Sequence, residues 1–204
     1  MCLTTNGTLL RRQMQILQQA KGLHKISVSL HSFEGNEGAG DMSHYLQGVW
    51  EACLPLSQSG VICALRLWNE GGGESRNREI EAFLESACGV PAEQWSAPRA
   101  GVKKLGENLF LERATIFDWP DLAAQERETE FCHALRQQVA VLCDGTVVPC
   151  CLDHEGDLAL GNLFAEDMDT ILSSSRARAI YEGFTKKEAA EELCRKCGYA
   201  RRFR

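Results

Sequence analysis

Cysteine is the residue type whose spacing points most directly to chemistry in this chain of 204 residues. Cys194 and Cys197 form the pair "CRKC", and a C-x2-C turn lets two thiolates converge on one metal. Cys150 lies in "LCDGTVVPCC", shortly after an Asp-Gly pair that is typical of a hairpin turn. Cys132 precedes this predicted hairpin. We therefore predict a metal centre held by Cys132, Cys150, Cys194 and Cys197.

The remaining six cysteines need another explanation. They are Cys2, Cys53, Cys63, Cys88, Cys143 and Cys151. Cys53 and Cys88 fall in apolar stripes at helical spacing, while Cys63 and Cys143 fall in alternating strand patterns. Free cysteine is among the most buried residue types, so we expect these four in the core. Cys2 supports no prediction.

Cys151 directly follows a predicted ligand. Adjacent residues of an extended strand point to opposite faces, so Cys150 and Cys151 are not expected to bind the same metal. We assign Cys150 as the ligand and expect Cys151 to pack beside the site.

Four thiolates suit either a structural zinc ion or a 4Fe-4S cluster. The 17 residues between Cys132 and Cys150 depart from the two-knuckle zinc pattern, which favours iron–sulfur. The spacing alone does not decide, and a chain without metal is a third possibility.

Composition and charge narrow the class of protein. With 44% apolar and 25% charged residues, the chain has the composition of a globular protein. The net charge of −6 argues against a nucleic-acid partner, and we interpret the basic end "RKCGYARRFR" (195–204) as solvated. No apolar run approaches the roughly 18 residues that span a bilayer, and no signal peptide is recognisable. We expect a cytoplasmic protein without membrane contact, whose thiols stay reduced.

The first part of the chain alternates strand and helix patterns. Strand patterns occupy 26–32 ("ISVSLHS"), 61–68 ("VICALRLW") and 108–117 ("NLFLERATIF"). Helical spacing of apolar residues covers 9–20, 45–54 and 80–88, with Gly89 as a predicted C-terminal cap. Such a repeat predicts an α/β fold with a parallel sheet covered by helices.

Beyond Phe131 the pattern changes to a hairpin and short helices. We predict two domains, 1–125 and 126–204. "TKKE" (185–188) has the form of a capping box and predicts the start of a short helix that ends at the C-x2-C pair. The glycine-rich stretches 34–40 and 70–74 each follow a strand, and are either loops near a functional face or simple connections.

The C-terminal pattern resembles SPASM, the auxiliary-cluster domain at the end of many radical S-adenosylmethionine (radical SAM) enzymes. The resemblance is carried by Cys132-x12-Gly145-x4-Cys150, "VVPCCLD", "LALGNL" (158–163) and Cys194-x2-Cys197. Upstream, "TTNGTLL" (4–10) resembles the third strand and turn of the radical SAM barrel, and "ISVSLHS" resembles the fourth. The resemblance implies a partial radical-SAM-type barrel without its first two strand–helix units, followed by a small SPASM-like domain.

Two departures from the family pattern matter. The fuller SPASM pattern continues with three more cysteines and binds two clusters, whereas this chain ends seven residues after Cys197, so one auxiliary cluster is expected. The Cys-x3-Cys-x2-Cys motif that holds the catalytic cluster is absent from the sequence. "GGGE" (71–74) resembles the family's methionine-binding motif but follows "TTNG" instead of preceding it, so we treat it as coincidence. We assign no catalytic residue.

The alternation of strand 26–32 directs Ser29 away from the helices, and Arg66 has the matching place in the next strand. The resemblance nominates Ser29, Arg66 and Asn6 as contacts to S-adenosylmethionine. For Arg66, an ion pair with an acidic residue is an equal alternative, because an unpaired buried charge is prohibitive.

We expect the cluster-binding C-terminal portion of a radical SAM/SPASM protein that modifies a peptide or small molecule. Whether the chain is an enzyme stays open, since it is not expected to cleave S-adenosylmethionine without the missing N-terminal part. One alternative is a non-catalytic partner or split-barrel subunit, and another is an interaction module stabilised by zinc on four cysteines. Missing strands would leave a sheet edge exposed, which predicts a partner chain or self-association.

Overall fold

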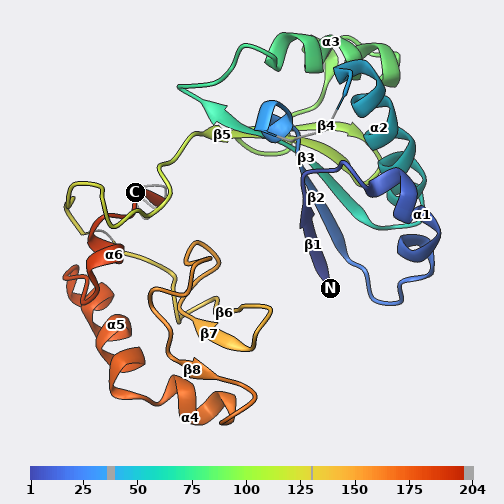
Figure 1. Cartoon of the computed structure of the whole chain (residues 1–204). Helices are drawn as coiled ribbons and strands as arrows, with labels where there is room; N and C mark the ends of the chain where they lie inside the picture. Colours follow the sequence, from blue (N-terminus) through green and yellow to red (C-terminus); the bar gives the residue numbers. More distant parts are fainter. Residues whose placement is uncertain (36–39, 130, 200–204) are drawn as a thin grey trace. The chain divides into compact units, whose positions relative to one another are not determined.

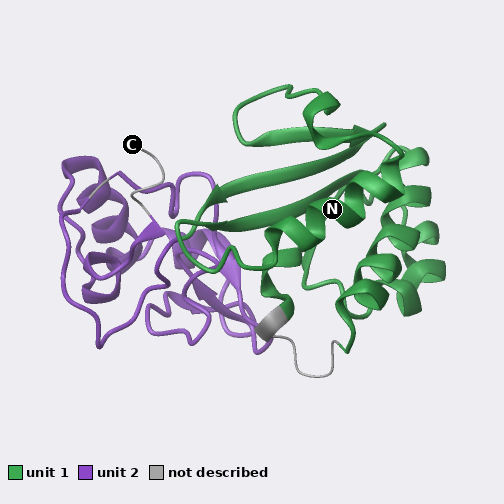
Figure 2. Ribbon diagram, turned by 90° about the horizontal axis from the view of Figure 1, so that it is seen from above, with its two compact units in different colours: residues 1–116 green, residues 117–204 purple. Residues whose placement is uncertain are grey.

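The computed structural model describes residues 1–35, 40–129 and 131–199 (Figure 1). Parts of the glycine-rich stretch 34–40 and of the basic end 195–204 therefore lie outside the described residues. The chain forms two compact units, residues 1–116 (unit 1) and 117–204 (unit 2), coloured separately in Figure 2.

The elements of unit 1 are β1 (Cys2–Thr5), α1 (Leu10–Gln19), β2 (Lys25–Ser29), η1 (Leu30–Gly35), α2 (Met42–Gln58), β3 (Ile62–Glu70), α3 (Asn77–Cys88), η2 (Ala92–Gln94), β4 (Val102–Gly106) and β5 (Leu109–Thr115). Those of unit 2 are β6 (Ala140–Val141), β7 (Thr146–Val148), β8 (Gly161–Asn162), α4 (Met168–Leu172), α5 (Ser175–Lys186) and α6 (Glu192–Arg195).

Unit 1 is built on a five-stranded sheet in the order β1-β2-β3-β5-β4. β1, β2, β3 and β5 are parallel, and β4 runs antiparallel to β5. The predicted α/β fold with a mainly parallel sheet is confirmed. The sheet ends at β1 and β4 instead of closing, and its identity as part of a barrel remains a prediction.

One face of this sheet carries the helices (Figure 1). Ile26 and Val28 of β2 are fully buried in a core that also contains Val49 of α2 and Leu84 of α3. Burying each aliphatic side chain of this kind contributes about 1.5–3 kcal/mol. Because strand residues alternate, Ser29 belongs to the opposite face, as the sequence predicted.

Local signals set the ends of several elements. Gly89 caps α3 in the left-handed conformation with φ 68°, so the predicted cap is confirmed. The Asp41 carboxylate accepts the N–H of His44 at the start of α2 over 3.0 Å. After β3, the Glu74 carboxylate accepts the N–H of Gly71 over 2.7 Å, which closes a local turn within "GGGE".

Unit 2 contains a hairpin in a small antiparallel sheet of order β6-β7-β8. Gly145 in its turn has φ 84°, and a Cβ at this position would lie 2.8 Å from the ring of Phe164. The N–H of Leu142 donates to the carbonyl of Thr146 over 2.8 Å. The predicted hairpin is confirmed, and its turn requires glycine for both conformation and space.

The segment after Ile116 belongs to unit 2. The ring of Phe117 meets that of Tyr199 edge-on with centroids 4.9 Å apart, and the N–H of Gly198 donates to the carbonyl of Asp118 over 3.3 Å. The division therefore falls after Ile116, whereas the sequence pattern placed it after residue 125.

The predicted capping box at "TKKE" is wrong. Thr185 and Lys186 are the last residues of α5, and the Thr185 hydroxyl donates to the carbonyl of Tyr181 over 3.1 Å. Ile180 and Phe184 are buried, so the apolar stripe of α5 continues to this point and keeps the chain helical. α6 begins only after Glu191.

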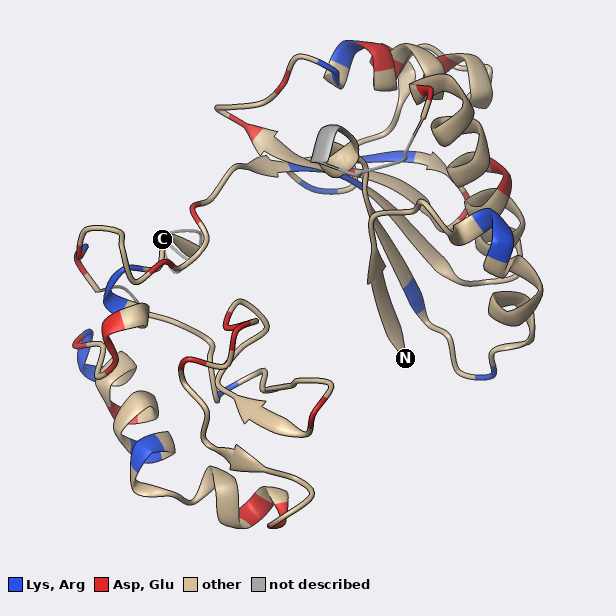
Figure 3. Ribbon diagram, in the orientation of Figure 1, with Lys and Arg blue, Asp and Glu red and all other residues tan. Residues whose placement is uncertain are grey.

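No helix among the described residues combines the length and the apolar character needed to cross a membrane. Lys and Arg are interspersed with Asp and Glu along both units (Figure 3).

Candidate metal centre

Four cysteines from three separate segments of unit 2 come together in the structure. Cys132 precedes β6, Cys150 follows β7, and Cys194 and Cys197 lie in and just after α6. The Cys194 thiol interacts electrostatically with the thiols of the other three, and Cys150 also interacts with Cys132. These are the four residues that the sequence nominated as metal ligands.

Apolar side chains surround three of these thiols. The buried residues of this apolar wall are Ala134, Ile180, Phe184 and Ala189. Cys132, Cys150 and Cys194 pack against them. Ile180 and Phe184 lie one turn apart on the same face of α5, so this helix supplies much of the wall. Such a wall limits the access of water and lowers the local dielectric constant, two properties that tune a metal centre.

Burial makes these thiols hard to ionise without a metal. It raises the pKa of Cys150 to about 11, and it raises the pKa of Cys132 and of Cys194 above the ordinary value of a thiol. The N–H groups of Leu152 and Asp153 lower the pKa of Cys150 in part, because they stabilise its thiolate. A bound cation would complete this stabilisation, since coordination deprotonates a thiol.

Backbone N–H groups also point at the other sulfurs. The N–H of Ala134 donates to Cys132 Sγ over 3.5 Å, and the N–H of Tyr199 donates to Cys197 Sγ over 3.4 Å. Hydrogen bonds to thiolate sulfur stabilise the charged form and help to set the potential of iron–sulfur clusters.

Zinc and a cluster place different demands on the spacing of four thiols. In the described part of the chain, no three or more His, Cys, Asp or Glu side chains are arranged to hold a metal ion. Four thiolates around zinc sit at about 2.3 Å from the metal, which requires a compact tetrahedron. A cluster places each thiolate on a different iron, so its ligands stand farther apart.

A comparison with known families found a match within this unit. Residues 132–198 match the family model of SPASM, an iron-sulfur cluster-binding domain. This match covers the four cysteines nominated as ligands. The resemblance of this part of the chain to SPASM that the sequence indicated is thereby confirmed.

A search of solved structures found selenomethionine BtrN in an open conformation. The similarity has a TM-score of 0.35 and 12% sequence identity, and it covers 96% of this chain and 91% of that chain. A similarity of this strength does not establish a shared fold. No curated protein gave a significant match.

The two adjacent cysteines, Cys150 and Cys151, do not lie in a strand as expected. β7 ends at Val148, and Cys150 and Cys151 lie in the bend and turn that follow. Cys151 is exposed, and it interacts electrostatically with the thiol of Cys150, so it lies near the site without being buried in it. The turn that directs the N–H groups of Leu152 and Asp153 at Cys150 also points Cys151 outward.

The predictions for the other cysteines have mixed outcomes. Cys53 and Cys63 are buried as predicted, and the Cys63 thiol donates to the carbonyl of Cys53 over 3.4 Å. Cys88 is only half-buried. The prediction for Cys143 is wrong, because β6 ends at Val141 and Cys143 lies exposed in the hairpin turn.

Asn6 has a local role in the structure. Its side-chain oxygen accepts the N–H of Thr8 over 3.2 Å and the Thr8 hydroxyl over 2.9 Å. Its carbonyl accepts the hydroxyl of the buried Tyr45 over 2.6 Å. These contacts shape the turn between β1 and α1.

Ser29 and Arg66 are paired positions on neighbouring strands. Arg66 Nε contacts the Glu112 carboxylate over 3.4 Å, and its guanidinium lies 4.3 Å from the centre of the Trp68 ring. The ion pair that the sequence left open for Arg66 is therefore present. Lys25 Nζ and Arg99 Nη2 reach the other Glu112 oxygen over 3.0 and 3.6 Å, which leaves one largely buried carboxylate among three cations.

Sequence patterns missed three polar residues next to the four converging cysteines. Asp153 is buried, and its carboxylate accepts two backbone N–H groups in the loop after Cys150. Arg176 and Glu191 form a two-pronged ion pair beside Cys194. Asp153 lies in the sequence "CCLD". Contacts between segments that are far apart in the sequence leave no periodic pattern that would reveal them.

Proposed function

We propose that the chain binds one 4Fe-4S cluster through Cys132, Cys150, Cys194 and Cys197, as the auxiliary cluster of a radical SAM/SPASM protein. The observation that carries this proposal is the convergence of these four thiols within the SPASM domain. Such a cluster supplies a one-electron redox centre, and in the family auxiliary clusters help to bind substrate or pass electrons.

Residues around the four cysteines make the site suitable for a 4Fe-4S cluster. Backbone N–H groups stabilise Cys132, Cys150 and Cys197 as thiolates, and the apolar wall on α5 keeps water away. The 17 residues between Cys132 and Cys150 depart from the two-knuckle zinc pattern, which favours a cluster over a single zinc ion.

Anaerobic purification tests this proposal directly. We expect a brown protein with about four irons and four sulfides per chain and a broad visible absorption band. A colourless protein that holds one zinc ion per chain would contradict the proposal and support the zinc-stabilised module.

For unit 1, we propose that it supplies part of an S-adenosylmethionine site when the rest of a barrel is provided. Ser29, Arg66 and Asn6 are the proposed contacts. Among the described residues, Arg66 uses only Nε in its ion pair, which leaves the end of its guanidinium for an anion such as the carboxylate of the cofactor. Asn6 is the weaker candidate for a cofactor contact, since its side-chain oxygen already accepts two hydrogen bonds from Thr8.

We further propose that the chain alone does not cleave S-adenosylmethionine. The reason is the sequence, which has no Cys-x3-Cys-x2-Cys motif. Incubating the purified chain with S-adenosylmethionine and a strong reductant should yield no 5′-deoxyadenosine. Its formation would contradict this part of the proposal.

A second candidate function is a subunit that completes its sheet with another chain. β1 is an edge strand paired only with β2 among the described residues, and an unpaired edge is a template for further strand pairing. Light scattering should then show self-association or a stable complex with a partner chain, whereas a lone monomer under all conditions would contradict it. We propose a peptide or a small molecule as the substrate and the cytoplasm as the location. We propose no nucleic-acid partner and no membrane contact.

A further inference from the structure

Arg176, in the first turn of α5, contacts two segments that carry cluster ligands. Its Nε and Nη2 donate to the two carboxylate oxygens of Glu191 over 2.7 and 3.0 Å. Its Nη1 donates to the carbonyl of Ala159 over 2.9 Å, and Nη2 also reaches the carbonyl of Asp157 over 3.4 Å. The guanidinium of Arg176 therefore links α5 to the loop that contains Asp157 and Ala159 and to Glu191 at the start of α6.

The first linked segment is the loop after Cys150. Asp153 is 2% exposed, and its carboxylate accepts the N–H groups of Asp157 and Leu158, each over 2.9 Å. This folds residues 153–158 into a closed loop and places the carbonyl groups of the loop toward Arg176. The position of Cys150 is thus tied through the loop to the guanidinium.

The second linked segment carries Cys194. Glu191 directly precedes α6 as its N-cap residue, and its side chain makes no capping hydrogen bond to that helix. The Glu191 carboxylate is held by Arg176 in a forked pair, a geometry that fixes direction as well as distance. Cys194 follows within the same short helix, so its place depends on this anchor.

The charge of Arg176 also acts on the site. Arg176 interacts electrostatically with the thiol of Cys194 and with Asp153, in addition to its pair with Glu191. Arg195 interacts with Cys194 as well. A cluster with four thiolates is negatively charged and gains further negative charge on reduction, so a nearby cation stabilises the reduced form.

We propose that Arg176 is a positioning residue of the cluster site, which holds the loop after Cys150 and the Cys194 turn at the spacing of the cluster and favours the reduced cluster by its charge. This inference rests on the proposed function.

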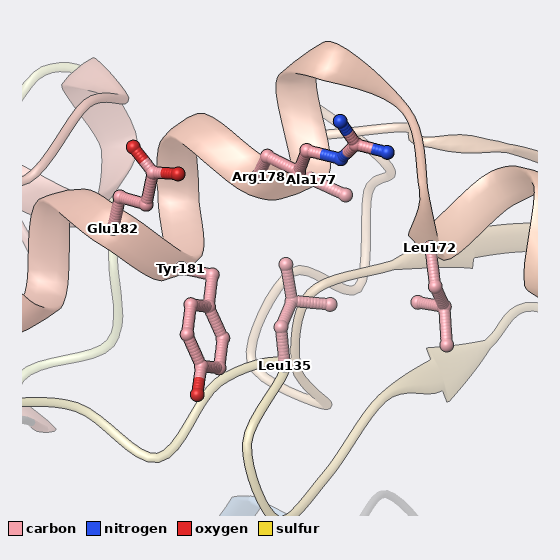
Figure 4. A pocket seen from close by; sticks show the side chains of 6 residues that line it. All are labelled: Leu135, Leu172, Ala177, Arg178, Tyr181 and Glu182. Atoms are coloured by element: carbon pink, nitrogen blue, oxygen red, sulfur yellow. The ribbon is translucent and has the colours of Figure 1, made fainter.

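The test compares Arg176→Met and Arg176→Lys with Arg178→Met. Arg178 is exposed on the same helix and lines a separate pocket of about 130 Å³ with Leu135, Leu172, Ala177, Tyr181 and Glu182 (Figure 4). Removing it takes away one arginine of α5 without touching the Glu191 pair. The readouts are the rate of iron loss to a chelator and the midpoint potential of the cluster.

We expect Arg176→Met to lose iron about 10- to 100-fold faster and to have a lower midpoint potential than the wild type. Arg176→Lys keeps the positive charge but not the two-pronged contact with Glu191. The midpoint potential of its cluster should therefore stay near that of the wild type, while iron loss remains accelerated. Arg178→Met should match the wild type in both measurements. Equal values for Arg176→Met and Arg178→Met would overturn the inference.

Two controls keep the outcome interpretable. Should Arg176→Met fail to fold, Arg176→Lys and Glu191→Gln carry the same test of iron retention. If the wild-type chain takes up no cluster, the proposed function fails. Hydrogen exchange of residues 153–159 in the metal-free chain then still tests whether Arg176 holds the loop after Cys150. Exchange in Arg176→Met no faster than in Arg178→Met would then overturn it.

Discussion

Gly183 of α5 lies against the carbonyl oxygen of Glu188, so closely that a Cβ on Gly183 would overlap that oxygen. The Glu188 N–H donates in turn to the Gly183 carbonyl over 2.8 Å. This contact turns the chain from the end of α5 toward Ala189, a residue of the apolar wall, and then to the cysteine pair.

The first prediction concerns this glycine. Gly183→Ala should destabilise unit 2 by about 1–3 kcal/mol, because backbone must move to admit the methyl group. It should also speed iron loss, since the displaced segment leads to Cys194. Denaturant unfolding of the metal-free chain measures the first effect. Ala179→Gly, at an exposed position of the same helix, provides the control and should cost roughly 1 kcal/mol without changing iron retention.

A second prediction concerns Glu112 of β5. Glu112→Gln removes the only carboxylate in contact with Lys25, Arg66 and Arg99 among the described residues. Breaking a largely buried ion pair from one side costs about 3–5 kcal/mol, so unit 1 should lose much of its stability. The exposed pair Arg76–Glu79 supplies the comparison. Glu79→Gln should change the free energy of unfolding by less than about 1 kcal/mol, and equal effects of the two substitutions would contradict the account.

A third prediction concerns pH. Burial raises the pKa of Cys132, Cys150 and Cys194 in the folded chain, and that of Cys150 reaches about 11. Unfolded thiols ionise near an ordinary pKa of about 8.5, so above that pH the unfolded chain binds fewer protons than the folded one. The metal-free chain should therefore be stable below about pH 8 and lose stability as the pH rises toward 11.

Denaturant unfolding of unit 2 at several pH values measures this effect. In Cys150→Ala the stability should decrease less steeply with rising pH, since one of the thiols with a raised pKa has been removed. Stability that increases over this range in the metal-free chain would contradict the burial of the thiols.

Much of unit 1 could be predicted from the sequence because its signals are local. The alternation in "ISVSLHS" gave the buried face of β2, and Gly89 marked the end of α3. A parallel sheet covered by helices follows from such repeats. The ends of short elements were less accessible: β6 has two residues, so Cys143 falls beyond its end and is exposed.

The candidate site was predictable only in part. The C-x2-C pair and the hairpin indicated which cysteines meet, because these motifs have few other uses in a reduced protein. Arg176, Glu191 and Asp153 were missed, since each acts on a segment brought close by folding. "TKKE" misled because a capping box signals a helix start only where the preceding chain is not already helical.

The central claim is that four particular sulfurs bind one cluster, and the most direct measurement is the iron and sulfide content of single Cys→Ser variants after anaerobic reconstitution. Substitution of Cys132, Cys150, Cys194 or Cys197 should each reduce bound iron and sulfide sharply. Cys143→Ser and Cys151→Ser, at exposed positions, should retain the wild-type content. Full iron and sulfide in any of the first four, or their loss in Cys151→Ser, would contradict the assignment.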